Sequence, residues 1–299
     1  MKRILCVGDI VLDVAGVISH AIEPGVETRA KISTQGGGAA ANVASWLAVN
    51  GVESFVIARI GDDAAGKTVI SELDDYGVKY NKRVIPGAKT GVVMILIDQQ
   101  GERTMFPDSG ANSGLSVEDL PDLAGFDAVY MSGYPFINPL SRNGALEIMT
   151  KVKGLGLPLI FDPSTVGLMR EVGIEQTRDW LARTDVIIMN DEEARYLSGK
   201  DDLEASLVDL LTLSEVVVIK RGAQGAVAQK RGSEIVSVPA VTSNLVSTVG
   251  AGDSFAAGFI ERWFDGGTLH DSLKRGTEVA ARCVALVGSR PLIRPASNP

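Results

Sequence analysis

Residues 246–262 read VSTVGAGDSFAAGFIER, a glycine-containing turn followed by an apolar stretch of helical composition. Gly250 and Gly252 lack side chains that would keep a ligand away from the backbone, and the first N–H groups of a helix have no acceptor within it. Because the helix dipole adds partial positive charge at this end, the turn predicts a binding site for a phosphoryl group. Asp253 lies inside this site, where it is either a helix cap or a base.

The composition indicates a globular protein. The chain has 299 residues, 45% of them hydrophobic, and a net charge of -8 with no run rich in Lys or Arg, which argues against a nucleic-acid binder. The two cysteines show no metal or disulfide spacing, and the two histidines stand in polar surroundings typical of the surface. General-base chemistry therefore falls to Asp or Glu. Since no signal peptide or membrane span is apparent, we expect a cytoplasmic protein without a membrane partner.

Short β-branched runs alternate with stretches of helical composition. The expected strands are Arg3–Val7, Ser54–Ile60, Ala128–Met131, Pro158–Phe161, Val186–Met189 and Val216–Lys220. The expected helices are Ala39–Asn50, Gly66–Tyr76, Asn138–Leu155 and Asp191–Ser198. This alternation predicts an α/β fold in which helices cover both faces of a mainly parallel sheet. Ligands of such sheets bind beyond the carboxyl ends of the strands, where polar residues such as Asp9, Asp162, Asn190 and Lys220 stand.

Two segments, 11–33 and 90–107, lack helical periodicity. The second alternates between apolar and polar residues around a turn at 99–101, which is typical of a β-hairpin. A strand pair added to an α/β domain indicates a small lid or a dimer contact. Its apolar side chains either cover a substrate or form the buried face of an ordinary hairpin; they include Met94, Leu96 and Phe106. No linker or repeat divides the chain, so we expect one domain over residues 1–299.

The segment Gly61–Thr68 matches the phosphate-loop pattern G-x-x-x-x-G-K-[ST] between a strand and a helix. Asp62 and Asp63 place two carboxylates in this loop, where they would oppose a triphosphate unless both pointed outward. The structural alternative is a tight turn in which an aspartate caps the helix and Lys67 is exposed in its first turn. We favour the turn; a P-loop NTPase using Gly61–Thr68 remains an alternative.

Two glycine-rich motifs occur together in this chain. The segment Gln35–Ala44, QGGGAAANVA, combined with Gly250–Asp253 resembles the paired signatures of the ribokinase-like (PfkB) carbohydrate kinase family. Further segments resemble the family's other motifs, in the family's order: Gly8–Asp13, Gly61–Gly66, Thr90–Val92, Gly110–Asn112, Asn190–Glu193 and Lys220–Gly225. The resemblance covers nearly the whole chain. It implies a three-layer α/β/α ribokinase-like fold with a mainly parallel central sheet and a small β lid formed by about 11–33 and 90–107.

The resemblance implies an ATP-dependent kinase that phosphorylates a hydroxyl of a sugar or sugar-like small molecule by in-line transfer. Asp253 is the implied base, and the implied anion hole is Gly250, Ala251 and Gly252. The implied substrate residues are Asp13, Gly37, Gly38 and Asn42. The implied nucleotide residues are Lys220, Gly222 and Gly225. Asn190 and Glu193 are implied to act on Mg²⁺ mainly through water, with a helix cap and its capping-box glutamate as the alternative.

Two positions depart from the family pattern. Ser247 stands where the family commonly has the Asp of a monovalent-cation loop, so we expect weak or absent activation by potassium. Ala39 stands where ribokinases proper carry Lys, so ribose itself is not favoured. Tyr134 either stacks on a ligand ring or packs in the protein, and a nucleoside kinase of the same family remains an alternative.

A catalytically silent sugar-binding protein is a further alternative function. We also expect the protein to form a homodimer through the lid.

Overall fold

The computed structural model describes residues 1–81, 84–100 and 102–292. Its strands are β1 (Arg3–Val7), β2 (Val11–Ile18), β3 (Ala30–Gly37), β4 (Glu53–Ile57), β5 (Ile60–Gly61), β6 (Lys79–Tyr80), β7 (Val84–Ile85), β8 (Gly91–Ile97), β9 (Arg103–Asp108), β10 (Ala128–Ser132), β11 (Leu159–Asp162), β12 (Val186–Asn190), β13 (Val216–Lys220), β14 (Ala226–Lys230) and β15 (Val236–Val238). Its α-helices are α1 (Ala39–Val49), α2 (Ala64–Tyr76), α3 (Tyr134–Ile137), α4 (Arg142–Gly154), α5 (Val166–Val172), α6 (Ile174–Leu181), α7 (Asp191–Ser198), α8 (Leu203–Leu210), α9 (Ala251–Phe264) and α10 (Leu269–Val284). Three short 3₁₀ helices are η1 (Gly110–Gly114), η2 (Val117–Asp119) and η3 (Gly222–Gln224).

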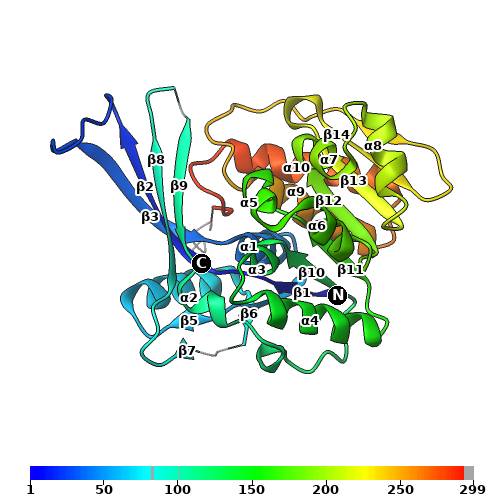
Figure 1. Ribbon diagram of the computed structural model, residues 1–299, viewed down its shortest axis with the longest axis horizontal. Helices are drawn as coiled ribbons and strands as arrows, with labels where there is room; N and C mark the ends of the chain where they lie inside the picture. Colours follow the sequence, from blue (N-terminus) through cyan, green and yellow to red (C-terminus); the bar gives the residue numbers. More distant parts are fainter. Residues whose placement is uncertain (82–83, 101, 293–299) are drawn as a thin grey trace, which may run out of the picture.

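The central sheet has the strand order β15-β14-β13-β12-β11-β10-β1-β4-β6. Its strands are parallel from β13 to β6, and the hairpin of β14 and β15 adds an antiparallel edge. Successive side chains of a strand point to opposite faces, so Ile4 and Cys6 of β1 enter one hydrophobic core while Leu5 and Val7 enter the other. The predicted mainly parallel sheet is confirmed (Figure 1).

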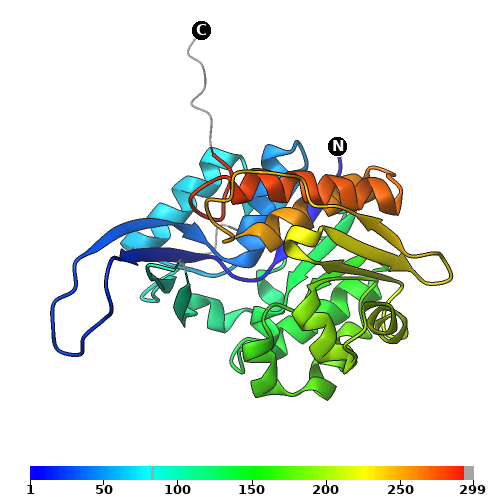
Figure 2. The same cartoon turned by 90° about the horizontal axis from the view of Figure 1, so that it is seen from above.

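Helices cover both faces of this sheet. Side chains from α1, α2, α9 and α10 fill the core on one face, and side chains from α3 to α8 fill the core on the other. In Figure 2 the blue and red helices lie on one side of the strands and the green ones on the opposite side. The predicted three-layer α/β/α architecture is therefore confirmed, and it brings the carboxyl ends of the parallel strands to one edge of the molecule.

Two predicted elements have different bounds in the structure. The helix expected over Asn138–Leu155 begins only at Arg142, because Pro139 disfavours helical geometry at Asn138, which instead accepts a hydrogen bond from the N–H of Leu140 at 3.0 Å. The strand expected over Ser54–Ile60 is divided into β4 and β5, and β5 leaves the central sheet to pair with β7.

A second sheet, with the order β3-β2-β8-β9, stands away from the body of the molecule (Figure 1). The predicted hairpin within 90–107 corresponds to antiparallel β8 and β9, although Gly101 of its turn lies outside the described residues. The other expected lid segment, 11–33, contains β2 and the start of β3.

The register of the second sheet sorts its side chains between two faces. Val93 and Ile95 of β8 and Met105 of β9 line the large cleft described below, whereas Met94 and Phe106, which pair with each other, point to the opposite face. Met94, Leu96 and Phe106, which the sequence offered as covers of a substrate, are therefore not among the residues that line this cleft. Side chains along a strand alternate between the two faces of the sheet, so the neighbours of these residues in sequence face the cleft instead.

Candidate active site

A cleft of about 840 Å³ lies between the carboxyl ends of the central strands and the second sheet. Its floor carries Asp9 after β1, Asp162 at the end of β11 and Lys220 at the end of β13, and Asp253 enters from the start of α9. Charged side chains from four segments that are far apart in the sequence thus lie in one cleft. Concave sites of this size with a few convergent polar groups are the usual form of a small-molecule binding site.

The glycine turn before α9 forms one wall of the cleft. Gly250 precedes the helix with φ 74°, and a Cβ atom there would come within 2.6 Å of the backbone of Ser289, so this position requires glycine. Within the described residues, the N–H groups of Gly252 and Asp253 have no hydrogen-bond acceptor in the protein. These donors and the positive end of the helix dipole make this turn suited to an anion.

Asp253 is half-buried beside this turn. Its Oδ2 accepts a hydrogen bond of 2.8 Å from Nδ2 of Asn42 on α1. Desolvation raises the pKa of Asp253 to about 7, against the lowering effect of Asn42, and the carboxylate of Asp162 raises it further. A carboxyl with a pKa near neutrality is suited to accept a proton at physiological pH.

Glycines and carboxylates meet where β3 runs into α1. The buried Asp13 of β2 lies so close to Gly37 that a Cβ atom there would come within 2.3 Å of its Oδ2. Burial raises the pKa of Asp13 to about 7, although Arg290 lowers it. Gly38, with φ 94°, comes directly before α1 and lines the cleft together with Asn42 and Asp13. Carboxylate and amide groups in such an arrangement can bind hydroxyl groups directionally.

Lys220 forms an ion pair at the base of the cleft. Its Nζ lies 2.7 Å from Oδ2 of Asp162, and a Cβ atom on Gly252 would lie 3.1 Å from this Nζ. Burial opposes the charge, but Asp162 and Glu193 hold the pKa of Lys220 above its ordinary value. The side chain is therefore a fixed cation beside the anion-binding turn.

Asn190 and Glu193 form the helix cap that was the alternative interpretation. Oδ1 of Asn190 accepts the N–H of Glu193 at 2.8 Å, and Oε2 of Glu193 accepts the N–H of Asn190 at 2.7 Å. Burial, and next the charge of Asp162, raise the pKa of Glu193. This concentration of oxygen donors and negative charge fits Mg²⁺, which prefers oxygen ligands and keeps several waters. Among the described residues there is no group of three His, Cys, Asp or Glu side chains that could hold a metal directly.

The phosphate-loop pattern at Gly61–Thr68 forms a capped turn. Oδ1 of Asp63 accepts the N–H of Gly66 at 2.8 Å and the hydroxyl of Thr90 at 2.7 Å, and Lys67 is exposed. The favoured interpretation of this segment agrees with the structure. The aspartate side chain takes an amide that a phosphate-binding loop would leave free for its ligand.

The cleft brings together most of the predicted site residues. Those that line it are Asp13, Gly38, Asn42, Asn190, Glu193, Lys220, Gly250, Gly252 and Asp253. Gly37, Ala251, Gly222 and Gly225 are not among its lining residues. Gly225 has another reason to be glycine, because its φ is 86° and a Cβ atom would come within 2.0 Å of the carbonyl oxygen of Val238.

Three further residues of this region were not among the predicted site residues. Asp162 was noted among the polar residues at the strand ends, but the sequence offered no reason to assign it a role in the site. Arg103 of β9 lines the cleft and donates a hydrogen bond to the hydroxyl of Thr248, and no motif marks it. Arg290 contacts Asn42 from the far end of the chain, which only the folded structure shows.

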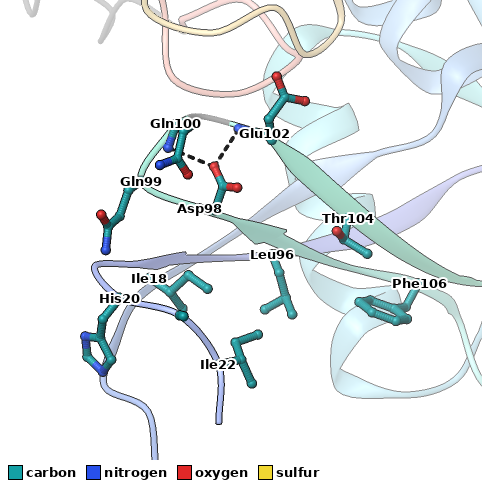
Figure 3. Close-up of a pocket in the computed structure, with 11 residues that line it drawn as sticks. Ile18, His20, Ile22, Leu96, Asp98, Gln99, Gln100, Glu102, Thr104 and Phe106 are labelled. Carbon is teal, nitrogen blue, oxygen red and sulfur yellow. Dashed lines mark hydrogen bonds between the residues drawn. The ribbon is translucent and has the colours of Figure 1, made fainter.

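A smaller hollow of about 480 Å³ lies at the tips of the second sheet. Ile18, Leu96 and Phe106 lie along it, and Asp98 binds the N–H groups of Gln100 and Glu102 in the adjoining turn (Figure 3). Its polar groups come from this one turn and the neighbouring strand ends. The large cleft, in contrast, collects charged groups from the central strands and α9, so we consider it the candidate active site.

Comparisons with known proteins agree with this geometry. The model of the pfkB family of carbohydrate kinases matches residues 1–295. The ATP-dependent ribose-1-phosphate kinase of Halopiger xanaduensis is 30% identical over 295 residues, which cover 97% of this chain and 93% of the relative. A fructokinase of Escherichia coli is 30% identical over 84% of each chain.

Solved structures confirm the predicted fold. The adenosine kinase of Sinorhizobium meliloti superposes with a TM-score of 0.88 over 97% of this chain and 96% of its own, at 23% identity. None of the described helices combines the length and apolar character needed to cross a membrane. On the strength of the family match and these relatives, the chain belongs to the pfkB family of carbohydrate kinases, which makes it a phosphotransferase acting on a hydroxyl group.

Proposed function

We propose that this protein transfers the γ-phosphoryl group of ATP to a hydroxyl of a sugar or sugar-like small molecule, with Asp253 as the base. The observation that carries the proposal is the position of this carboxylate, with its raised pKa, beside the N–H groups of Gly252 and Asp253, for which the described part of the chain provides no acceptor. One turn thus supplies both a proton acceptor and an anion site. In a loose phosphoryl-transfer transition state the hydroxyl loses its proton late, so positioning contributes much of the catalysis.

The phosphoryl group is proposed to lie between the turn Gly250–Gly252 and Lys220. The N–H groups of Gly252 and Asp253 donate to its oxygens, whereas the N–H of Ala251 is bonded to the carbonyl oxygen of Thr248 at 3.3 Å. The ammonium group of Lys220 offsets the charge of the phosphoryl group. Asp162 holds this ammonium group in place through the 2.7 Å ion pair. The remainder of the nucleotide is proposed to extend toward Gly222 and Gly225, in the turn that follows β13.

Asn190 and Glu193 are proposed to hold Mg²⁺ through water at the end of β12. When bound, the ion would neutralise charge on the β- and γ-phosphates of ATP. The helix cap fixes Oδ1 of Asn190 and Oε2 of Glu193 in hydrogen bonds. The other carboxylate oxygen of Glu193 is left for water. Ser247 uses its hydroxyl to accept the N–H of Val249 at 3.2 Å, and we propose little activation by potassium because no carboxylate stands there.

The acceptor is proposed to bind between Asp13, Gly37, Gly38 and Asn42. The hydroxyl-binding groups of this set favour a sugar, and the names of the ribose-1-phosphate kinase and fructokinase relatives support this class. Tyr134, which is 38% exposed and lines the cleft, favours a nucleoside as the second candidate acceptor because its ring can stack on a base. The sheet of β2, β3, β8 and β9 is proposed to be the lid over this acceptor, and its outer face to join two copies of the chain.

The proposal is tested with two substitutions and a panel of acceptors. ADP release is measured with hexoses, pentoses, ribose 1-phosphate, keto-deoxy acids and nucleosides, with and without potassium. Asp253→Asn is expected to lower acceptor-dependent ADP release by about 10²- to 10⁴-fold, whereas Lys67→Ala leaves it nearly intact. Loss of activity in the Lys67 variant with retention in the Asp253 variant would instead assign the chemistry to Gly61–Thr68. ATP binding without ADP release for every acceptor would indicate a silent binder.

A further inference from the structure

Arg290 lies in the loop after α10, and its side chain contacts residues of the proposed acceptor site. Its side chain is only 3% exposed. Nη1 lies 2.9 Å from Oε2 of Glu72 on α2, Nη2 donates to the carbonyl oxygen of Gly37 at 2.9 Å, and Nε donates to Oδ1 of Asn42 at 3.2 Å. One guanidinium group therefore binds three separate parts of the structure with three different nitrogens.

These contacts fix the orientation of the Asn42 amide. Oδ1 of Asn42 accepts hydrogen bonds from Nε of Arg290 and from the hydroxyl of Ser289, both at 3.2 Å. Nδ2 of the same amide donates to Asp253 at 2.8 Å. An arginine can only donate hydrogen bonds, so the amide oxygen must face Arg290 and the NH₂ group must face the carboxylate.

The same cation also fixes the backbone of the glycine-rich motif. Glu72, the ionic partner of Arg290, accepts the N–H of Gly36 at 2.8 Å, and Arg290 itself binds the carbonyl oxygen of Gly37. A Cβ atom on Gly36 would come within 2.0 Å of Nη1 of Arg290. Gly36 is therefore glycine because the guanidinium group packs against it, and it need not touch a ligand to be required.

We propose that Arg290 is a positioning residue for phosphoryl transfer, which orients the Asp253 carboxylate through Asn42 and holds the Gly37 backbone against the acceptor. The inference rests on the proposed function, since it assigns Arg290 a role in placing that base and that acceptor. A misplacement of reacting groups by about 1 Å can cost 10²-fold in rate, so a clamp of this kind has a large effect without touching substrate.

Arg290 acts on Asp253 through Asn42 rather than by its own charge. The titratable groups that face Asp253 are Asp9, Tyr130, Tyr134, Asp162, Lys220 and Cys283. The hydrogen bond from Asn42 lowers the pKa of Asp253. Loss of the clamp would weaken this bond and raise that pKa, which moves the acidic limb of the pH profile of kcat/KM to higher pH.

The test compares Arg290→Met and Arg290→Lys with a matched control, Arg178→Met. Arg178 is a half-buried arginine that, like Arg290, pairs with a carboxylate, Asp209 at 2.6 Å, and with a backbone carbonyl, but it lies on α6 at the other face of the sheet. Arg290→Met is expected to lower kcat by about 10- to 100-fold, to leave KM for ATP unchanged, and to shift the acidic limb upward. Arg290→Lys is expected to recover part of kcat because it keeps the charge but not the three-way contact. Arg178→Met should reduce thermal stability without moving the pH profile.

An unchanged kcat or an unmoved acidic limb in folded Arg290→Met would overturn the inference. If Arg290→Met does not fold, Arg290→Lys and Ser289→Ala take its place in the test, since each weakens the hydrogen bonds to Oδ1 of Asn42. A wild-type pH profile in both of these variants would overturn the inference. If the wild-type protein releases no ADP with any acceptor, the proposed function fails. The role of Arg290 is then decided by ¹³C NMR titration of Asp253, assigned with Asp253→Asn, in the wild type and Arg290→Lys. An identical titration in the two proteins counts against the inference.

Discussion

Carboxyl groups of the cleft are held close together with few cations between them. Burial raises the pKa of Asp9 to about 6 and that of Asp13 to about 7, and desolvation has the same effect on Asp253. Because each of these groups binds its proton more tightly in the folded protein than in the unfolded chain, their ionisation opposes folding. The acids that make the site useful for chemistry therefore reduce its stability at neutral pH.

The pH dependence of stability follows from these pKa shifts. For Asp253 the folded-state pKa lies above the unfolded value, so the free energy of unfolding falls as pH rises from about 4 to about 7 and is constant above. Asp253→Asn removes this loss and is expected to be more stable than the wild type at pH 8 by on the order of 1 to 3 kcal/mol, with no difference near pH 4. Urea unfolding between pH 4 and pH 8 measures the difference.

Asp271 gives a control of opposite sign. Hydrogen bonds from Thr268 at the start of α10 lower the pKa of Asp271, so its ionised form stabilises the fold. Asp271→Asn should therefore lose stability at neutral pH, and the loss should disappear as pH falls below the ordinary range of an aspartate. Equal pH dependence in the Asp253 and Asp271 variants would contradict the assignment of a raised pKa to Asp253.

The sequence could predict Asp253 and its turn because the information is local. Glycines before a helix with an acid at its third position describe the anion site without knowledge of the fold. The role of Arg290 could not be predicted in the same way, since it depends on contacts with residues more than 200 positions away. The face of Met94 and Phe106 was also beyond prediction, because alternation along a strand does not say which side the cleft occupies.

The start of α2 shows how a helix terminus can imitate a nucleotide site. Asp63 caps the helix through Gly66 and also joins it to Thr90, the residue before β8, since it accepts both the N–H of Thr90 at 2.9 Å and its hydroxyl. Glycine at 66 is needed because a Cβ atom would come within 2.3 Å of the carbonyl oxygen of Gly61. The conspicuous glycine and aspartate of this motif thus have a purely structural explanation.

Removing this cap is expected to affect stability more than catalysis. Asp63→Ala loses three hydrogen bonds and should lower the free energy of unfolding by about 1 to 3 kcal/mol, while acceptor-dependent kcat stays near that of the wild type. Asp62→Ala is the matched control, because Asp62 is exposed and accepts a hydrogen bond from the N–H of Gly87 at 3.1 Å. Denaturant titration and steady-state kinetics measure the two effects. Loss of catalysis in folded Asp63→Ala would contradict the structural role.

Element bounds were predictable where local chemistry ends an element. The strand Arg3–Val7 and the helix Asp191–Ser198 agree with β1 and α7, since Asn190 caps this helix and Gly199 ends it with φ 66°. The expected start at Asn138 was wrong, because Pro139 disfavours helical geometry at the residue before it, and the helix begins at Arg142. The antiparallel hairpin of β14 and β15 was not predicted, because edge strands of a sheet carry weaker apolar patterns than central ones.

At the scale of the whole molecule, the second sheet has apolar side chains on both faces. One face turns Val93, Ile95 and Met105 toward the cleft. The outer face presents Ile32, Met94 and Phe106, which are 68%, 45% and 48% exposed. An exposed apolar face on a sheet of this kind favours pairing with another chain, and a second copy of this chain offers a complementary surface of the same kind.

This arrangement predicts a dimer that a single charge can dissociate. The wild-type protein is expected to sediment as a dimer, and Phe106→Asp as a monomer, because the substitution would bury an unpaired carboxylate in the interface. Val208→Asp is the matched control, since Val208 is 64% exposed on α8 and far in sequence from the second sheet. Sedimentation velocity measures the three proteins. A monomeric wild type, or a dimeric Phe106 variant, would refute the proposed contact.

The contact between Asn42 and Arg290 spans 248 positions of the chain. During translation at about 5 to 20 residues per second, the glycine-rich motif would leave the ribosome roughly 12 to 50 s before the arginine that clamps it. Throughout that interval Asn42, Gly37 and Glu72 would exist without the guanidinium group that organises them. A nascent chain of this enzyme would therefore acquire competence for catalysis only at a late stage of synthesis, after most of its sheet is already available to fold.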